Sequence, residues 1–260
     1  MPIWPLNGNV HRLWARAGSE LPVLYHLLLK RVRGRDHAAR MESFYAGQAQ
    51  RYDDFRRRLL PGREDLYRRI EPQAGGTWVD LGGGTGANLE SIGPSIQRCG
   101  KIYLVDLAPS LLAVARERIA RHGWNHVEAV EGDACTFRPA CAADVVTFSY
   151  SLTMIPDWFA ALENACAMLK PGGLIGVVDF YVSRKYVPAT GVRHGWLTRT
   201  FWPIWFGCDN VVLSADHVPY LHRHFTATHF TEGRAHVPYL PLGRVPHYLF
   251  IGRKRDETTP

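Results

Sequence analysis

The stretch Thr77-Trp-Val-Asp80-Leu-Gly82-Gly-Gly84-Thr-Gly86 decides the fold of this chain of 260 residues. Its mostly apolar start predicts a short buried strand over Thr77–Leu81, and glycines follow directly. Glycine has no Cβ, so it permits a tight turn and a close approach of the backbone to a ligand. A helix expected after Gly86 would offer free backbone N–H groups to an anionic part of that ligand.

Acidic residues follow the next two predicted strands. Asp106 comes directly after Ile102–Val105, and Glu131-Gly-Asp133-Ala follows His126–Val130. The carboxyl ends of parallel strands meet at one edge of a sheet, where ligands bind. Asp106 is therefore placed to accept hydrogen bonds from two ribose hydroxyls, and the third strand end is placed to reach an adenine amino group. The glycine pattern alone leaves the ligand open, because Gly82-x-Gly84-x-x-Ala87 also fits the nicotinamide-dinucleotide fingerprint.

Strand and helix patterns alternate along the rest of the chain, which predicts a parallel sheet with helices on its faces. A helix that Pro171, Gly172 and Gly173 would end precedes the fifth strand. The further elements expected are helices over 111–119 and 159–169 and strands over 143–148, 174–181, 234–239 and 247–252.

Four motifs in this order resemble those of class I S-adenosylmethionine (SAM)-dependent methyltransferases: Asp80 to Gly86, Val105-Asp106, Gly132-Asp133-Ala134 and Leu169-Lys-Pro-Gly-Gly173. The resemblance covers residues 71–182 and implies an α/β Rossmann-like fold, with a mostly parallel seven-stranded sheet whose last strand is antiparallel. It also implies SAM as cofactor and S-adenosylhomocysteine as product, with no metal. Asp80 would then accept from the ammonium group of SAM. The expected cofactor-binding residues are Tyr52, Asp80, Gly82, Gly84, Gly86, Asp106, Leu107, Asp133, Ala134 and Ser149.

Stretches outside these motifs carry a closer resemblance. The segments 44–53, 151–158, 178–183 and 194–205 look like the N-methyltransferase component of betaine-lipid synthesis. That resemblance implies stepwise trimethylation of the amino group of diacylglyceryl-homoserine to diacylglyceryl-trimethylhomoserine, with a partner enzyme that supplies the substrate. The alternatives are phosphatidylethanolamine N-methylation, quinone-type C-methylation and a non-catalytic SAM-binding protein. RNA methylation of adenine N6 or cytosine N4 is disfavoured, because Ser149-Tyr-Ser-Leu stands where an Asn-Pro-Pro-Tyr-like tetrapeptide is needed.

Aromatic residues suit a product that ends as a quaternary ammonium, since their faces attract such a cation without hydrogen bonds. We expect Tyr150, Asp179 and Tyr45 to be the catalytic residues. Asp179 either accepts or orients the amine proton, or is a buried structural carboxylate. Further aromatic candidates for the same role are Tyr52, Tyr181, Trp196, Trp202 and Trp205.

The net charge of +7 is confined to the first quarter of the chain. Residues 1–70 hold 14 Lys and Arg against 7 Asp and Glu, whereas the remainder holds 17 of each. We expect a basic helical extension over 1–70 and a methyltransferase core over 71–260 with an aromatic-rich insertion over 183–224. The extension has helical patterns over 21–35 and 41–59, and the second has an apolar face that includes Met41. The basic, partly apolar pattern of Leu21 to Arg35 favours peripheral contact with an anionic membrane surface, and no nucleic-acid partner is expected. The alternative is a helix that packs on the core with its basic face in solvent. With no membrane span, no signal peptide and five scattered cysteines, the expected location is cytoplasmic and membrane-associated.

Overall fold

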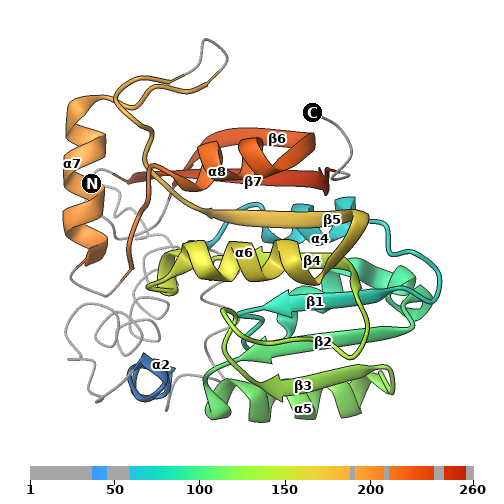
Figure 1. Ribbon diagram of the computed structural model, residues 1–260. Helices are drawn as coiled ribbons and strands as arrows, with labels where there is room; N and C mark the ends of the chain where they lie inside the picture. The colour runs from blue at the N-terminus through green and yellow to red at the C-terminus, as the bar shows by residue number, and fades with distance from the viewer. Residues whose placement is uncertain (1–36, 46–58, 188–190, 208–210, 237–242, 256–260) are drawn as a thin grey trace, which may run out of the picture.

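The computed structural model describes residues 37–45, 59–187, 191–207, 211–236 and 243–255, and it contains a seven-stranded sheet in the order β3-β2-β1-β4-β5-β7-β6 (Figure 1). β1 pairs in parallel with β2 and β4, whereas β7 runs antiparallel to both β5 and β6. This confirms the mostly parallel sheet with an antiparallel last strand. The strands are β1 (Thr77–Leu81), β2 (Lys101–Asp106), β3 (Val127–Glu131), β4 (Ala143–Ser149), β5 (Leu169–Phe180), β6 (Phe225–His236) and β7 (Arg244–Lys254).

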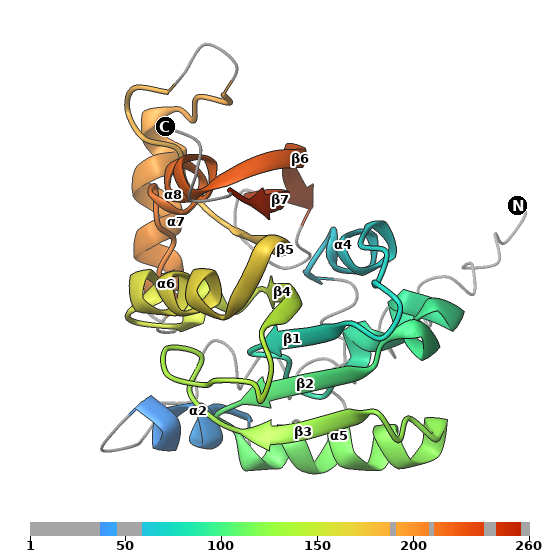
Figure 2. The same cartoon turned by 45° about the vertical axis from the view of Figure 1, so that its right-hand side comes forward.

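Helices cover both faces of the sheet. One apolar core includes side chains of α4, η1 and α5, and the other includes side chains of α6 and α8. Figures 1 and 2 accordingly show α4 on one face and α6 and α8 on the other. The helices are α2 (His37–Tyr45), α4 (Arg63–Arg69), η1 (Ala87–Arg98), α5 (Pro109–His122), η2 (Leu152–Met154), α6 (Trp158–Met168), α7 (Trp196–Gly207) and α8 (His217–His224).

Local sequence explains where helices α5 and α6 begin and where α5 ends. Pro109 opens α5, where its missing N–H costs nothing, and Gly123 ends it with a φ of 65°. Asp157 caps α6 by accepting a hydrogen bond from Ala160 N at 3.0 Å. Both helices lie within two or three residues of the predicted ranges.

Three predicted elements differ from the structure. The helix expected after the glycine loop is instead two 3₁₀ helices separated by a kink, because Gly93 has a φ of 65° and Pro94 follows it. β5 begins at Leu169 instead of residue 174, since Leu169 already pairs with Ala143. The sixth strand is β6 over 225–236, not 234–239. Its Thr and His residues obscure the alternation of apolar and polar side chains, so the sequence does not reveal its start. In the structure β6 pairs with β7 along its whole length.

Helix α4 belongs to the packed core although it precedes residue 71. Leu66 and Tyr67 are fully buried, and Tyr67 stacks on Trp78 of β1 with ring centroids 5.9 Å apart. The helical patterns expected over 21–35 and 41–59 lie mostly outside the described residues; α2 covers the part of the second pattern up to Tyr45. In the described parts of the chain, no helix combines the length and apolar character needed to cross a membrane.

Candidate functional site

The glycine loop after β1 folds back onto the end of β2. Gly82 N and Gly83 N both donate to Val105 O, at 2.8 and 3.1 Å, and Gly84 N donates to Asp106 Oδ2 at 2.8 Å. Gly82, Gly84 and Gly86 have φ values of 69°, 59° and 70°. These left-handed conformations strain residues that have a Cβ, which explains why glycine occupies the three positions.

A cavity of about 250 Å³ lies at the carboxyl ends of the parallel strands. Five of the residues expected to bind the cofactor line it, and so does one expected catalytic residue. Its polar side includes Asp106 and Asp133, while Met41, Leu111 and Met154 belong to its apolar side. The predicted residues that it brings together are Gly82, Asp106, Leu107, Asp133, Ala134 and Tyr150.

The carboxylates of Asp106 and Asp133 are held by backbone groups at neighbouring strand ends. Asp106 pairs with Glu131 across β2 and β3, and its Oδ1 accepts from Ala108 N at 2.9 Å. Asp133 Oδ1 accepts from Cys135 N at 2.8 Å. A carboxylate oxygen can accept more than one hydrogen bond, and both side chains line the cavity, where a nucleoside could donate to them.

Asp80 is fully buried beneath the glycine loop. Its Oδ1 accepts from Tyr67 Oη at 2.6 Å and from Thr147 Oγ1 at 2.8 Å. Burial raises the pKa of Asp80 to about 6, although these hydrogen bonds and the charge of Arg63 act in the opposite direction. Asp80 does not line the 250 Å³ cavity, so its carboxylate holds α4 and β4 against β1 in this structure.

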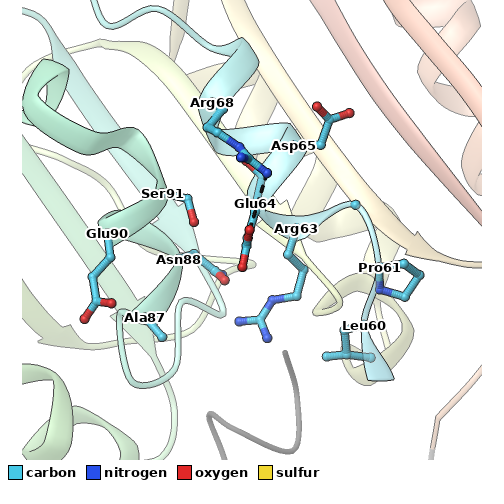
Figure 3. Close-up of a pocket in the computed structure, with 11 residues that line it drawn as sticks. Leu60, Pro61, Arg63, Glu64, Asp65, Arg68, Ala87, Asn88, Glu90 and Ser91 are labelled. Atoms are coloured by element: carbon cyan, nitrogen blue, oxygen red, sulfur yellow. Dashed lines mark hydrogen bonds and ion pairs between the residues drawn. The ribbon is translucent and has the colours of Figure 1, made fainter. Parts of the chain in front are cut away.

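Arg63, which the sequence analysis did not single out, lies at the start of α4 and is 8% exposed. Figure 3 shows its guanidinium reaching into a second cavity of about 690 Å³, between Pro61 and Ala87. Burial raises the pKa of Tyr67, Asp80 and Tyr150, and the charge of Arg63 partly opposes that rise at all three groups. A buried cation beside the start of η1 is a suitable partner for a carboxylate.

Tyr150, directly after β4, has a strained left-handed backbone conformation. Its φ of 54° is the only positive value among described residues other than glycine. Its hydroxyl donates to Pro61 O at 2.7 Å, and its ring meets that of Phe180 edge-on at 4.7 Å. Burial raises the pKa of Tyr150 well above its usual value, so the phenol stays neutral and contributes its ring to the cavity. Ser149, one residue earlier, is 2% exposed within β4 and lies outside the cavity.

Asp179 supports the loop that follows β4. Its Oδ1 accepts from Thr153 Oγ1 at 2.8 Å and its Oδ2 from Thr153 N at 3.2 Å. Asp179 is fully buried and lines none of the cavities described above, and burial raises its pKa to about 7. This geometry favours the alternative of a buried structural carboxylate, which positions η2 and thereby Met154 at the cavity.

Helix α2 closes part of the cavity from a distant point in the sequence. Met41 is 6% exposed and lines it, and Glu42 Oε2 accepts from Ser110 N and Oγ at 3.1 and 3.0 Å. The sequence pattern indicated an apolar face through Met41 but not what that face would cover. Of the two tyrosines expected in this region, Tyr45 ends α2 with a side chain that is not described, and Tyr52 lies outside the described residues.

The remaining aromatic candidates do not gather at the cavity. Trp202 is 2% exposed in the core, Tyr181 donates to Glu232, and Trp196 is 69% exposed on the surface. Within the described ranges, no three His, Cys, Asp or Glu side chains are placed together to hold a metal ion.

Comparison with known proteins agrees with this geometry. Residues 79–175 match the family model of a methyltransferase domain. The chain is 31% identical over 124 residues to a demethylmenaquinone methyltransferase of Anoxybacillus flavithermus, which covers 46% of this chain and 51% of that protein. It is 28% identical over 172 residues to a ubiquinone/menaquinone biosynthesis C-methyltransferase of Pseudomonas fluorescens, covering 64% and 67%. The chain thus spans about half of the length of the first relative.

A solved structure shares the fold. The N-methyltransferase NodS of Bradyrhizobium japonicum, crystallised with S-adenosyl-L-homocysteine, superposes with a TM-score of 0.57 at 18% identity. The likeness covers 79% of this chain and 91% of that chain.

Proposed function

We propose that this chain, which carries a class I SAM-dependent methyltransferase domain, methylates the amino group of a lipid, with diacylglyceryl-homoserine as the acceptor and diacylglyceryl-trimethylhomoserine as the product. The observation that carries the proposal is the composition of the cavity. Asp106 and Asp133, which suit a nucleoside, line it together with Asp157, and Tyr150, Met154 and Met41 supply its apolar and aromatic lining.

The described residues fit SAM. Asp106 would accept from the ribose hydroxyls, and Asp133 and Ala134 would meet the adenine. Gly82 must lack a Cβ, because that atom would overlap the Cβ of Ser151, which also lines the cavity. Arg63 supplies a buried positive charge beside the glycine loop, which suits the carboxylate of the methionine part.

Methyl transfer to nitrogen requires the site mainly to align the acceptor nitrogen with the methyl group and to exclude water from the reacting atoms. Bound SAM supplies a methyl group on a sulfonium, which a neutral nitrogen can take up while the sulfur keeps the electron pair of the broken bond. A free amino group has a pKa of roughly 8, so it must lose its proton before it reacts. The cavity residues would hold the acceptor in line and exclude water, and the Tyr150 ring would favour the growing cationic character of the methylated nitrogen.

The choice of a lipid amine as acceptor rests on residues of the cavity lining and on the residues that hold them. The segments 151–158 and 178–183, which resemble the betaine-lipid family, supply Ser151, Met154 and Asp179. The first two of these line the cavity, and Asp179 holds the loop that bears them. The segment 194–205 forms most of α7, whose Phe206 packs on Phe180 at 5.4 Å next to Tyr150.

A second candidate is C-methylation of a quinone precursor. The relatives at 28% and 31% identity carry that activity in their names, so the comparisons favour this candidate over amine methylation. Both acceptors are amphiphiles, and the apolar side of the cavity suits either.

The deciding experiment offers the purified protein isotope-labelled SAM with each acceptor in turn, dispersed in the same detergent. The acceptors are diacylglyceryl-homoserine, phosphatidylethanolamine and demethylmenaquinone. We expect mass spectrometry to find one, two and three labelled methyl groups on diacylglyceryl-homoserine. Label on demethylmenaquinone alone would establish the second candidate, and label on phosphatidylethanolamine alone would replace both.

A further inference from the structure

Helix α7 and the loop before it present large apolar side chains to solvent. Trp196 is 69% exposed, Leu197 67% and Tyr186 77%. Figure 1 shows α7 at the edge of the molecule, on the side toward which β1, β2 and β3 point. Apolar side chains gathered in this way mark an interaction surface. We define the outer patch as Lys185, Tyr186, Val192, Arg193, Trp196 and Leu197, all exposed.

The outer patch is held firmly on the protein. Ser183 N donates to His194 Nδ1 at 2.9 Å, and His194 N donates to Ser183 Oγ at 2.8 Å, so this pair closes the base of the loop. Val192 N donates to Glu232 Oε2 at 2.9 Å. On the inner face of α7, Trp202 is 2% exposed. The patch residues therefore point outward from a packed support.

The charge of this region has one sign. Residues 183–207 contain four Lys and Arg and no Asp or Glu. Arg184 pairs with Asp216 at 2.6 Å, which leaves Lys185 and Arg193 as exposed cations beside the apolar side chains. Trp and Tyr with neighbouring basic residues are typical of segments that lie at the depth of lipid headgroups.

A path of cavities leads from α7 to the cofactor cavity. A further cavity of about 230 Å³ is lined by Gly207, at the end of α7, and by Val212. Met41, Met154 and Pro156 line both this cavity and the 250 Å³ cavity. Arg40 and Thr153 also line the 230 Å³ cavity, so a headgroup that enters beside Gly207 would meet both apolar and polar side chains before the proposed position of the methyl donor.

We propose that the outer patch docks on an anionic lipid bilayer, with Trp196, Leu197 and Tyr186 in the headgroup region and Lys185 and Arg193 facing lipid phosphates. This inference rests on the proposed function only in that a lipid acceptor gives the contact a purpose. A second copy of the chain is a poorer occupant, because a two-fold contact would bring like charges together. Residues 1–36 hold six Lys and Arg against two acidic residues, so they do not complement the patch either.

The test is flotation of the full-length protein with vesicles of phosphatidylcholine that contain or lack phosphatidylglycerol. We expect the double variant Trp196→Ser, Leu197→Ser to lower partitioning onto the anionic vesicles by about tenfold or more. Lys185→Glu with Arg193→Glu should lower binding to the anionic vesicles at low salt and have little effect at high salt. The matched control is Phe159→Ser, which removes a 46% exposed apolar side chain on α6 and should bind as wild type.

Two results would overturn the proposal. One is unchanged vesicle binding by the Trp196→Ser, Leu197→Ser variant. The other is a wild-type dimer in light scattering that the same variant dissociates, which would make the patch a contact between copies. SAM binding by calorimetry and the unfolding midpoint show that the variants are folded. Vesicle binding without methyl transfer to any lipid would refute the proposed function and leave the docking surface standing.

Discussion

Replacing Gly82 by alanine tests whether the glycine loop is shaped by the cavity or only by its backbone angles. Gly82 has a φ of 69°, and an added Cβ would overlap the Cβ of Ser151 and lie 3.0 Å from its Oγ. Ser151 cannot withdraw freely, since it is 5% exposed and its Oγ donates to Leu81 O at 2.9 Å. Gly75 offers a matched control with a φ of 70° and no atom within 4 Å of the added Cβ.

The two variants share one cost and differ in another. A left-handed alanine costs roughly 1–2 kcal/mol of strain at either position, offset in both by a smaller gain from the stiffer unfolded chain. Only Gly82→Ala adds overpacking, which costs typically about 1–3 kcal/mol in a packed interior. We therefore expect Gly82→Ala to lower the free energy of unfolding by about 1–3 kcal/mol more than Gly75→Ala does.

Urea unfolding measures this difference, and calorimetry with SAM measures its consequence at the site. Displacement of Ser151 changes the wall of the 250 Å³ cavity, so Gly82→Ala should weaken SAM binding by about tenfold or more while Gly75→Ala binds as wild type. Equal unfolding free energies for the two variants, together with equal SAM affinities, would refute the reasoning.

Three further predictions test other parts of the structure. Asp106→Ala should weaken SAM binding about tenfold to a hundredfold, the value of one charge-assisted hydrogen bond. The control is Asp144→Ala, which removes a carboxylate that is bonded to Thr77 N and does not line the cavity. Unchanged SAM affinity in Asp106→Ala would contradict the ribose assignment. Burial raises the pKa of Asp179 to about 7 from 3.8, so between about pH 4 and pH 7 Asp179 holds a proton in the folded state that it releases in the unfolded state, and its contribution to the free energy of unfolding should fall as the pH rises. Burial lowers the pKa of His194 to about 4 and that of His217 to about 3, and these two groups act in the opposite direction. The difference in unfolding free energy between wild type and Asp179→Ala, measured by urea titration at several pH values, should therefore fall from about pH 4 to about pH 7, and a constant difference would show that Asp179 does not titrate in this range. Replacing Lys30, Arg31, Arg33 and Arg35 by glutamine should weaken binding to anionic vesicles without changing SAM affinity, and equal vesicle binding would defeat the predicted role of the basic N-terminus.

The local pattern was sufficient to predict the strand–loop–strand geometry around the glycines. β1, the glycine loop and Asp106 at the end of β2 are close in sequence, and each has a signal of its own: an apolar run, residues without Cβ, and an acid after a strand. A parallel sheet then brings the carboxyl ends of the strands together, independently of how the helices pack. For the same reason the sequence predicts Gly82, Asp106, Asp133 and Tyr150 as site residues, and all four line the cavity.

Burial separated residues that the sequence treats alike. Asp80, Asp106 and Asp179 all stand at or near strand ends, yet Asp106 lines the cavity whereas Asp80 and Asp179 are fully buried. The difference arises from the covering elements: α4 supplies the Tyr67 hydroxyl to Asp80, and η2 supplies Thr153 to Asp179. No short sequence pattern encodes which element will cover a given strand end.

What the sequence determined by itself is the parallel strands and the glycine loop at their edge, because strand period, glycine and acidic residues act over a few neighbouring positions. The class of ligand followed from the resemblance of the four ordered motifs to a known family. Only the tertiary structure decided which side chains form the walls. Met41 reaches the cavity because Glu42 bonds to Ser110, 68 residues away. On α7, Trp202 is buried and Trp196 exposed because the helix packs one face against Phe180. Contacts between distant residues assign such roles, since each depends on which surface of one element meets another.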